Sequence, residues 1–241
     1  MKLYFECNNG ISGDMAVAAL LDLGADRLKM EEAFESLDLD NEFSYNIKQV
    51  QVNAITATDF NVILKNDKTN HHRNLKDIIT IIEKAKVSEK AMALAKKIFQ
   101  IVAEAEAKVH KLPIEEVHFH EVGAIDSIAD ILGFAVLYDN LNPEKVYFST
   151  LSEGQGSVKC QHGLLSVPVP AVCEIVKRFQ IPVRITENDG EMITPTGAAI
   201  VAALYSPEKL TNDIIINKIG CGAGKRKYPN PVLRVMDVEE R

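Results

Sequence analysis

Short extended segments alternate with helical segments along almost the whole of this 241-residue chain. Near the start, KLYFEC (2–7) has the pattern of a strand, and a helix is expected from Ser12 to about Leu23. Near the end, DIIINKIG and PVLRVMDV have strand patterns on either side of a glycine-rich loop. Strands that alternate with helices pack as layers around a sheet. The sequence therefore predicts a layered α/β fold with a mixed sheet, with an α+β arrangement as the alternative.

The first half of the chain contains a long helical segment, at about 74–140. A helix is also expected earlier, over 27–37. Two strands are expected over 43–52 and 55–64, followed by a polar loop over 65–74. Three helices are expected after the loop, over 74–85, 88–110 and 124–140. We expect one domain over 1–241, with any internal boundary near 141–144.

Glycine and proline interrupt the second half of the chain. A strand, a helix and a second short strand are expected there, over 145–150, 171–179 and 183–186. A further helix begins at TPTGAA, where Thr194 is suited to the N-cap and Pro195 to the first helical position.

Composition excludes several classes of protein. Lysine and arginine together number 27 and aspartate and glutamate 34, giving a net charge of −7, so a nucleic-acid-binding surface is not expected. No apolar run reaches the ~18 residues that a membrane span needs, and the start lacks the pattern of a signal peptide. The sequence therefore predicts a cytoplasmic protein without membrane contact.

The segment HFHEVGAIDSIADILG (118–133) carries the strongest indication of a metal site. On an extended backbone His118 and His120 project to the same face, and Glu121 could add a carboxylate. Imidazole and carboxylate ligands suit nickel, zinc, iron or manganese, and the spacing does not choose among them. The alternative is a solvated strand end followed by a helix cap.

Asp126 and Asp130 lie one helical turn apart in the same segment, where like charges repel. Asp126 falls in the first turn and is also explained by the helix dipole. Asp130 lies deeper, within an apolar run, and needs a partner such as a cation, a metal or a histidine N–H. We therefore include both aspartates among the candidate metal ligands.

Two further groups could bind a metal. Cys160 and His162 are two residues apart in GSVKCQHG, and a nearby histidine or lysine favours the thiolate. His71 and His72 lie together in a polar loop. The alternatives are a glycine-flanked hairpin with an ordinary cysteine and a solvated loop.

Three segments resemble phosphate-binding loops. Two are helix starts, in NNGISGD and TPTGAA, whose N–H groups are available to an anion. The third, GCGAGKRK, is rich in glycine and cations but is not a Walker loop. Together they indicate a phosphorylated small molecule, with plain turn geometry as the alternative. The candidate phosphate-binding residues are Ser12, Gly13, Asp14, Thr196, Gly197, Lys225 and Arg226.

Five motifs in order resemble those of the nickel insertion protein LarC family: GISGDMAVAALLDLG, HFHEVGAIDSIADILG, GSVKCQHGLLSVPVPA, TPTGAAI and GCGAGKRKYPN-PVLRV. The resemblance implies a lyase-type cyclometallase that inserts Ni(II) into pyridinium-3,5-bisthiocarboxylic acid mononucleotide. The product is the nickel-pincer cofactor of lactate racemase, and the reaction uses CTP with Mn(II) or Mg(II).

The chain departs from the family pattern in two places. Family members usually have Asp-Cys-Phe-Ser-Gly where this chain has ECNNG (6–10). They also continue beyond VLRVMDV into a C-terminal domain associated with CTP binding and oligomer assembly. The expected partners are therefore a C-terminal half of the same enzyme and further copies of the chain.

Forming a nickel–carbon bond requires a base for the ring proton, and the resemblance leaves His118, His120 and Glu121 as candidates. The predicted catalytic residues are His118, His120, Glu121, Cys160 and His162. The predicted metal ligands are His118, His120, Glu121, Asp126, Asp130, His71 and His72. The alternative functions are a non-catalytic nickel chaperone and a metal-dependent phosphohydrolase.

Overall fold

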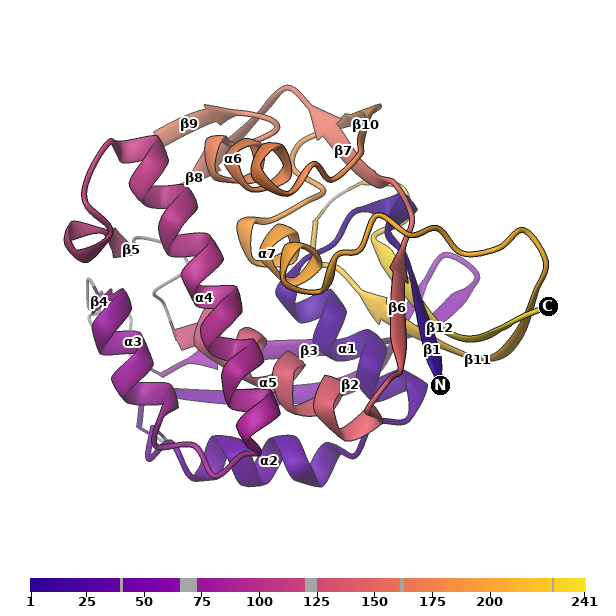
Figure 1. Ribbon diagram of the computed structural model, residues 1–241, viewed down its shortest axis with the longest axis horizontal. Coiled ribbons are helices and arrows are strands. Elements are labelled where there is room, and N and C mark those ends of the chain that lie inside the picture. The colour runs from indigo at the N-terminus through magenta and orange to yellow at the C-terminus, as the bar shows by residue number, and fades with distance from the viewer. Residues whose placement is uncertain (40, 66–72, 120–124, 161–162, 227) are drawn as a thin grey trace.

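A mixed six-stranded sheet forms the centre of the protein, which confirms the expected α/β fold (Figure 1). The computed structural model describes residues 1–39, 41–65, 73–119, 125–160, 163–226 and 228–241. In spatial order the strands are β2 (Phe43–Val52), β3 (Ile55–Leu64), β11 (Ile214–Ala223), β12 (Val232–Glu240), β1 (Lys2–Glu6) and β6 (Lys145–Phe148).

Strand directions place four carboxyl ends at one edge of this sheet. β1 pairs antiparallel with β12 and parallel with β6, while β11 pairs antiparallel with β12 and parallel with β3. β1, β3, β6 and β11 therefore run in the same direction. Both chain termini lie at the opposite edge, where the Lys2 ammonium is 2.7 Å from the Glu240 carboxylate (Figure 1).

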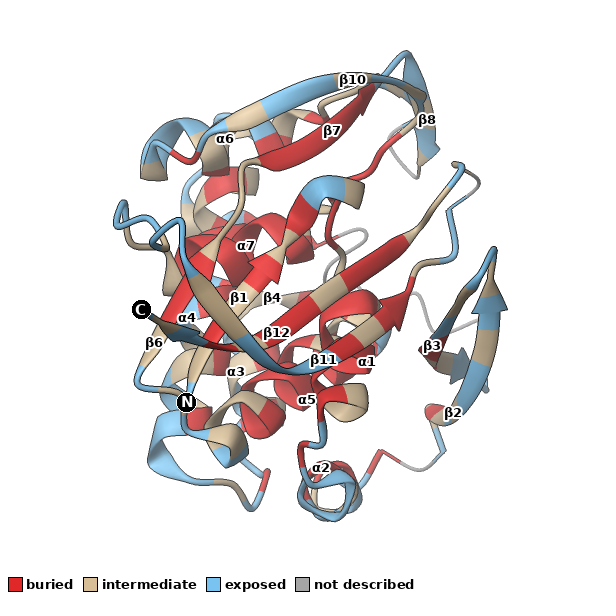
Figure 2. Cartoon of the chain, turned by 90° about the vertical axis from the view of Figure 1, so that its right-hand side faces the viewer, coloured by how far each residue is buried: buried red, intermediate tan, exposed pale blue. Residues whose placement is uncertain are grey.

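Helix α1 (Gly13–Leu23) packs directly on the sheet, and glycines of β11 make the close approach possible. A Cβ atom at Gly220 would lie 2.2 Å from the Ala19 carbonyl oxygen, and one at Gly222 would lie 2.1 Å from that of Met15. The remaining helices pack around α1 and beyond it, on the side of the sheet away from the viewer in Figure 2. They are α2 (Arg27–Glu35), α3 (Leu75–Ile82), α4 (Glu89–His110), α5 (Ile125–Leu141), α6 (Pro170–Phe179) and α7 (Pro195–Leu204).

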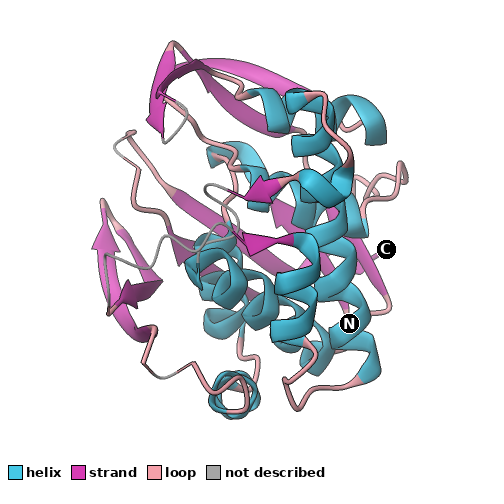
Figure 3. Cartoon of the chain, turned by 90° about the vertical axis from the view of Figure 1, so that its left-hand side faces the viewer, coloured by secondary structure: helices cyan, strands magenta, loops and turns pink. Residues whose placement is uncertain are grey.

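Three small strand pairs lie outside the main sheet (Figure 3). They are β7 (Leu151–Gln155) with β10 (Val183–Asp189), β8 (Ser157–Cys160) with β9 (Gly163–Ser166), and β4 (Arg73–Asn74) with β5 (His118–Phe119). The prediction of a polar loop over 65–74 is therefore wrong at its C-terminal end, because Arg73 and Asn74 pair with β5. The expected strand over 145–150 ends at Phe148, and β7 begins at Leu151.

The helix starts follow their capping residues in most cases. Ser88 and Thr194 accept hydrogen bonds from the backbone N–H groups of Ala91 and Gly197, at 3.0 and 3.1 Å. Ser12 occupies the N-cap of α1, but its hydroxyl donates to the Asp14 carboxylate instead of accepting from the backbone. None of the described helices is long and apolar enough to cross a membrane.

Candidate functional site

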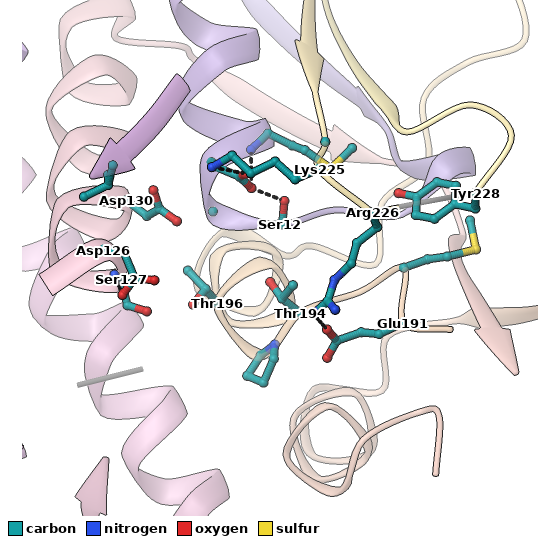
Figure 4. A pocket seen from close by; sticks show the side chains of 17 residues that line it. Ser12, Asp126, Ser127, Asp130, Glu191, Thr194, Thr196, Lys225, Arg226 and Tyr228 are labelled. Carbon is teal, nitrogen blue, oxygen red and sulfur yellow. Dashed lines mark hydrogen bonds and ion pairs between the residues drawn. The ribbon is translucent and has the colours of Figure 1, made fainter. Parts of the chain in front are cut away.

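A polar pocket of about 310 Å³ lies at the sheet edge where the four strands end (Figure 4). Four separated segments form its walls: 12–15 at the start of α1, 126–130 on α5, 191–196 at the start of α7, and 224–228 after β11. Val62, near the end of β3, completes the described lining. Ligands of α/β proteins commonly bind beyond the carboxyl ends of strands, so the topology and the pocket agree.

The pocket brings together two sets of residues that are separate in the sequence analysis, the candidate phosphate-binding residues and the candidate metal ligands. Six of the seven candidate phosphate-binding residues line it, namely Ser12, Gly13, Asp14, Thr196, Lys225 and Arg226. The candidate metal ligands Asp126 and Asp130 line it as well. Gly197 lies just behind, where a Cβ atom would be 2.2 Å from the Ile11 carbonyl oxygen.

Carboxylates already neutralise both cations of the pocket. The Lys225 ammonium lies 3.1 Å from Asp14 Oδ2, and Asp14 Oδ1 accepts a hydrogen bond from the Met15 N–H at 2.9 Å. The Arg226 guanidinium pairs with Glu191, whose side chain is only 6% exposed. An anionic ligand must therefore compete with these two carboxylates for the cations.

Asp130 is held against the start of α1, on the opposite wall from Arg226 (Figure 4). A Cβ atom at Gly13 would lie 2.6 Å from Asp130 Oδ2, so only glycine permits this approach. Burial raises the pKa of Asp130 well above its ordinary value. The carboxylates of Asp14 and Asp126 raise this pKa further, and the Lys225 ammonium opposes them.

The described lining has more negative than positive groups. Four carboxylates, those of Asp14, Asp126, Asp130 and Glu191, face two cations, Lys225 and Arg226. Such a surface is electrostatically suited to a cation, and to an anion only when a cation is also present.

The described residues alone do not complete a metal site. No three histidine, cysteine, aspartate or glutamate side chains within the described ranges lie close enough together to hold one ion. Cys160, at the end of β8, is not among the described residues that line the pocket. The backbone of His118 pairs with Asn74 between β5 and β4. The other candidate ligands lie outside the described residues: His71, His72, His120, Glu121 and His162.

Sequence reasoning missed four polar residues of the described lining: Ser127, Glu191, Tyr228 and Thr194, the last of which was predicted only as a helix cap. The Tyr228 hydroxyl donates to the Asn9 carbonyl oxygen at 2.7 Å and so ties the loop after β11 to the segment after β1. Burial raises the pKa of Tyr228. Ser127 could have been inferred from its neighbour Asp126, whereas no local pattern distinguishes Glu191 or Tyr228.

The charged pocket at the strand ends of a mixed sheet lies where α/β proteins commonly bind small ligands. A family model described as "Nickel insertion protein" matches residues 3–241. The chain therefore belongs to the nickel insertion protein family, and the resemblance to LarC is confirmed.

Relatives of this chain carry matching names. A pyridinium-3,5-bisthiocarboxylic acid mononucleotide nickel insertion protein of Alkaliphilus metalliredigens is 46% identical, over 99% of this chain and 61% of its own length. One of the same name from Acetivibrio thermocellus is 46% identical, over 93% of this chain and 57% of its own. A putative nickel insertion protein of Dictyoglomus thermophilum is 42% identical, over 97% of this chain and 59% of its own length. The chain thus spans about three fifths of these relatives, and no solved structure matches it.

Proposed function

We propose that this chain inserts nickel(II) into pyridinium-3,5-bisthiocarboxylic acid mononucleotide, with both substrates bound in the pocket at the sheet edge. One observation carries the proposal: the pocket joins two helix starts and two cations to an excess of carboxylates. The helix starts and the two cations are suited to the phosphate of a mononucleotide, and the carboxylates are suited to a divalent cation. The names of the longer relatives support this choice of substrates.

The phosphate binds at the starts of α1 and α7 in this proposal. Backbone N–H groups at Gly13 and Thr196 lie in the first turns of these helices, where the helix dipoles favour an anion. Lys225 and Arg226 add charge once the phosphate has replaced their carboxylate partners. Nickel bound to the neighbouring carboxylates would favour this exchange, because it offsets their charge.

Nickel is held between protein and substrate. Asp126 and Asp130 supply oxygen donors, and the two thiocarboxylates of the mononucleotide supply sulfur. His118, His120 and Glu121 complete the ligand set, and one of the three takes the ring proton. A ring C–H bond breaks, its carbon bonds to nickel, and the proton leaves to the base, so the charge balances.

The remaining parts of the proposal follow the family resemblance. Cys160 and His162 assist the insertion, and His71 and His72 collect nickel. A C-terminal half contributes CTP with Mn(II) or Mg(II), so that the assembled enzyme is a cytoplasmic lyase supplying the nickel-pincer cofactor of lactate racemase. A nickel chaperone and a metal-dependent phosphohydrolase are the alternatives. The chaperone is less well supported, because a carrier has no need of the anion-binding groups.

Nickel binding tests the histidine assignment. In isothermal titration with Ni(II), the His118→Ala/His120→Ala variant should bind at least about tenfold more weakly than the wild type, because two imidazole ligands are lost. His110→Ala is the matched control, since this histidine pairs with Glu106 on α4 and should leave the affinity unchanged. Equal affinities in the wild type and the double variant would contradict the assignment.

Substrate binding tests the phosphate assignment. The Lys225→Ala/Arg226→Ala variant should bind the mononucleotide about tenfold more weakly, because two charge-assisted contacts to the phosphate are lost while two carboxylates lose their partners. Lys145→Ala/Lys177→Ala removes two charges that pair with surface glutamates and should have no effect. An unchanged Kd in the first variant would place the phosphate elsewhere.

A further inference from the structure

Glu153 is a buried carboxylate that the proposed function does not use. It lies on β7, its side chain is fully buried, and it is not among the described residues that line the pocket. Burying a carboxylate is unfavourable unless hydrogen bonds compensate, so its position needs an explanation.

One oxygen of Glu153 accepts three backbone hydrogen bonds. Its Oε1 lies 2.8 Å from the N–H nitrogen of Gly154, 2.6 Å from that of Met192 and 3.2 Å from that of Ile193. Its Oε2 has no hydrogen-bond partner among the described residues. Two of the three donors belong to the segment just before α7, so the carboxylate joins β7 to that segment.

The segment held by Glu153 is in turn bonded to the start of α1. The Ile11 N–H donates to the Met192 carbonyl oxygen at 3.0 Å, and the Thr194 N–H donates to the Ile11 carbonyl oxygen at 3.1 Å. The contact is tight, since a Cβ atom at Gly10 would lie 2.1 Å from the Met192 carbonyl oxygen. Glu153 therefore holds in place the two backbone segments that lead directly into α1 and α7.

Both helices begin in the pocket immediately after these contacts. Ser12 precedes α1, Thr194 caps α7, and Glu191, the partner of Arg226, precedes the residues that Glu153 holds. A shift of the 191–194 segment would move all three groups with respect to one another. Misplacement of binding groups by about 1 Å can reduce activity about 100-fold.

We propose that Glu153 is a positioning residue that aligns the starts of α1 and α7 for the anionic part of the substrate. The inference rests on the proposed function, in which these helix starts bind the mononucleotide phosphate. In this role Glu153 acts through the backbone of Met192 and Ile193, and through them on Ile11, without touching the substrate.

Three variants test this role. Glu153→Ala removes the acceptor of three N–H groups and should weaken mononucleotide binding about tenfold or more, with Ni(II) affinity unchanged. Glu153→Gln keeps an acceptor oxygen at the same place and should restore most of the affinity. Met30→Ala is a control for lost stability, because this fully buried side chain lies on α2, away from the pocket lining.

Amide hydrogen exchange gives a readout that does not need the substrate. The first helical hydrogen bonds of α1 and α7 run from Ala16 N–H to Ser12 O and from Ala198 N–H to Thr194 O. Both amides should exchange faster in Glu153→Ala and at the wild-type rate in Met30→Ala. Unchanged exchange at both, or equal loss of mononucleotide affinity in the two variants, would overturn the role of Glu153. If the wild type bound no mononucleotide, the proposed function alone would be refuted. The exchange rates would still test whether Glu153 aligns the starts of α1 and α7.

Discussion

Gly197→Ala should abolish most substrate binding and also destabilise the fold. The added methyl would lie 2.2 Å from the Ile11 carbonyl oxygen and 3.0 Å from the Ser12 nitrogen, and both are backbone atoms that cannot rotate away. Overpacking of this kind typically costs about 1–3 kcal/mol, and we expect the upper end of that range. The start of α7 must move away from the start of α1, so affinity for the mononucleotide should fall about 100-fold. Urea unfolding and equilibrium binding measure the two effects.

Gly24→Ala is the matched control for this substitution. Gly24 ends α1 at the far side from the pocket with a φ of 108°, and the nearest atom to an added Cβ is Lys218 Nζ at 3.9 Å. Backbone strain alone should cost about 1–2 kcal/mol there and leave substrate affinity intact. If Gly197→Ala bound the mononucleotide as tightly as Gly24→Ala does, the two helix starts would not form the phosphate site.

Asp130→Asn should reduce nickel insertion about 100-fold while making the metal-free protein more stable at neutral pH. In the proposed function Asp130 is a nickel ligand, so activity should fall because an amide is a much weaker nickel ligand than a carboxylate. The stability rises because a buried amide needs neither to carry a charge beside Asp14 and Asp126 nor to retain a proton that the unfolded state has lost. Nickel incorporation into the mononucleotide and urea unfolding in EDTA measure the two changes.

The pH dependence of this stability has a defined sign. The folded state raises the pKa of Asp130, so above the ordinary aspartate pKa of about 4 it retains a proton that the unfolded state has lost. Stability of the metal-free wild type should therefore decline as the pH rises from that value through the folded-state pKa. Asp130→Asn should show a flatter profile over the same range.

Asp139→Asn provides the control on the same helix. Asp139 lies at the other end of α5 and accepts a hydrogen bond from the Ser88 hydroxyl at 2.6 Å, so its substitution should lower stability slightly and leave insertion unchanged. A loss of stability in Asp130→Asn, or full activity, would exclude the electrostatic role assigned to Asp130.

Much of the local structure was predictable from the sequence. The Thr194 cap and the proline after it placed the start of α7 correctly, and the strand patterns at 43–52 and 55–64 match β2 and β3. Local hydrogen bonds and side-chain periodicity determine such features, and both act over a few residues. The two-residue strand β4 escaped prediction, because its pairing with β5 joins segments more than 40 residues apart.

The candidate site was predictable only in part. Motif spacing identified Asp130 as a carboxylate needing a partner, but nothing local indicated that Gly13 and Asp14 lie against it. Glu153 and Glu191 carry no recognisable pattern, since their roles depend on the backbone of segments that are distant in sequence or on a cation 35 residues away.

The sequence by itself determined the family, the order of strands and helices, and the types of group available for chemistry. The tertiary structure alone decided which of those groups share a pocket, because β1 and β11 run in the same direction and bring the segments near 12 and 225 to one sheet edge, where the starts of α5 and α7 pack beside α1. It also decided that the candidate phosphate and metal groups adjoin and that carboxylates neutralise both cations. Such proximity arises from the packing of buried faces across the whole chain, which no local pattern of residues encodes.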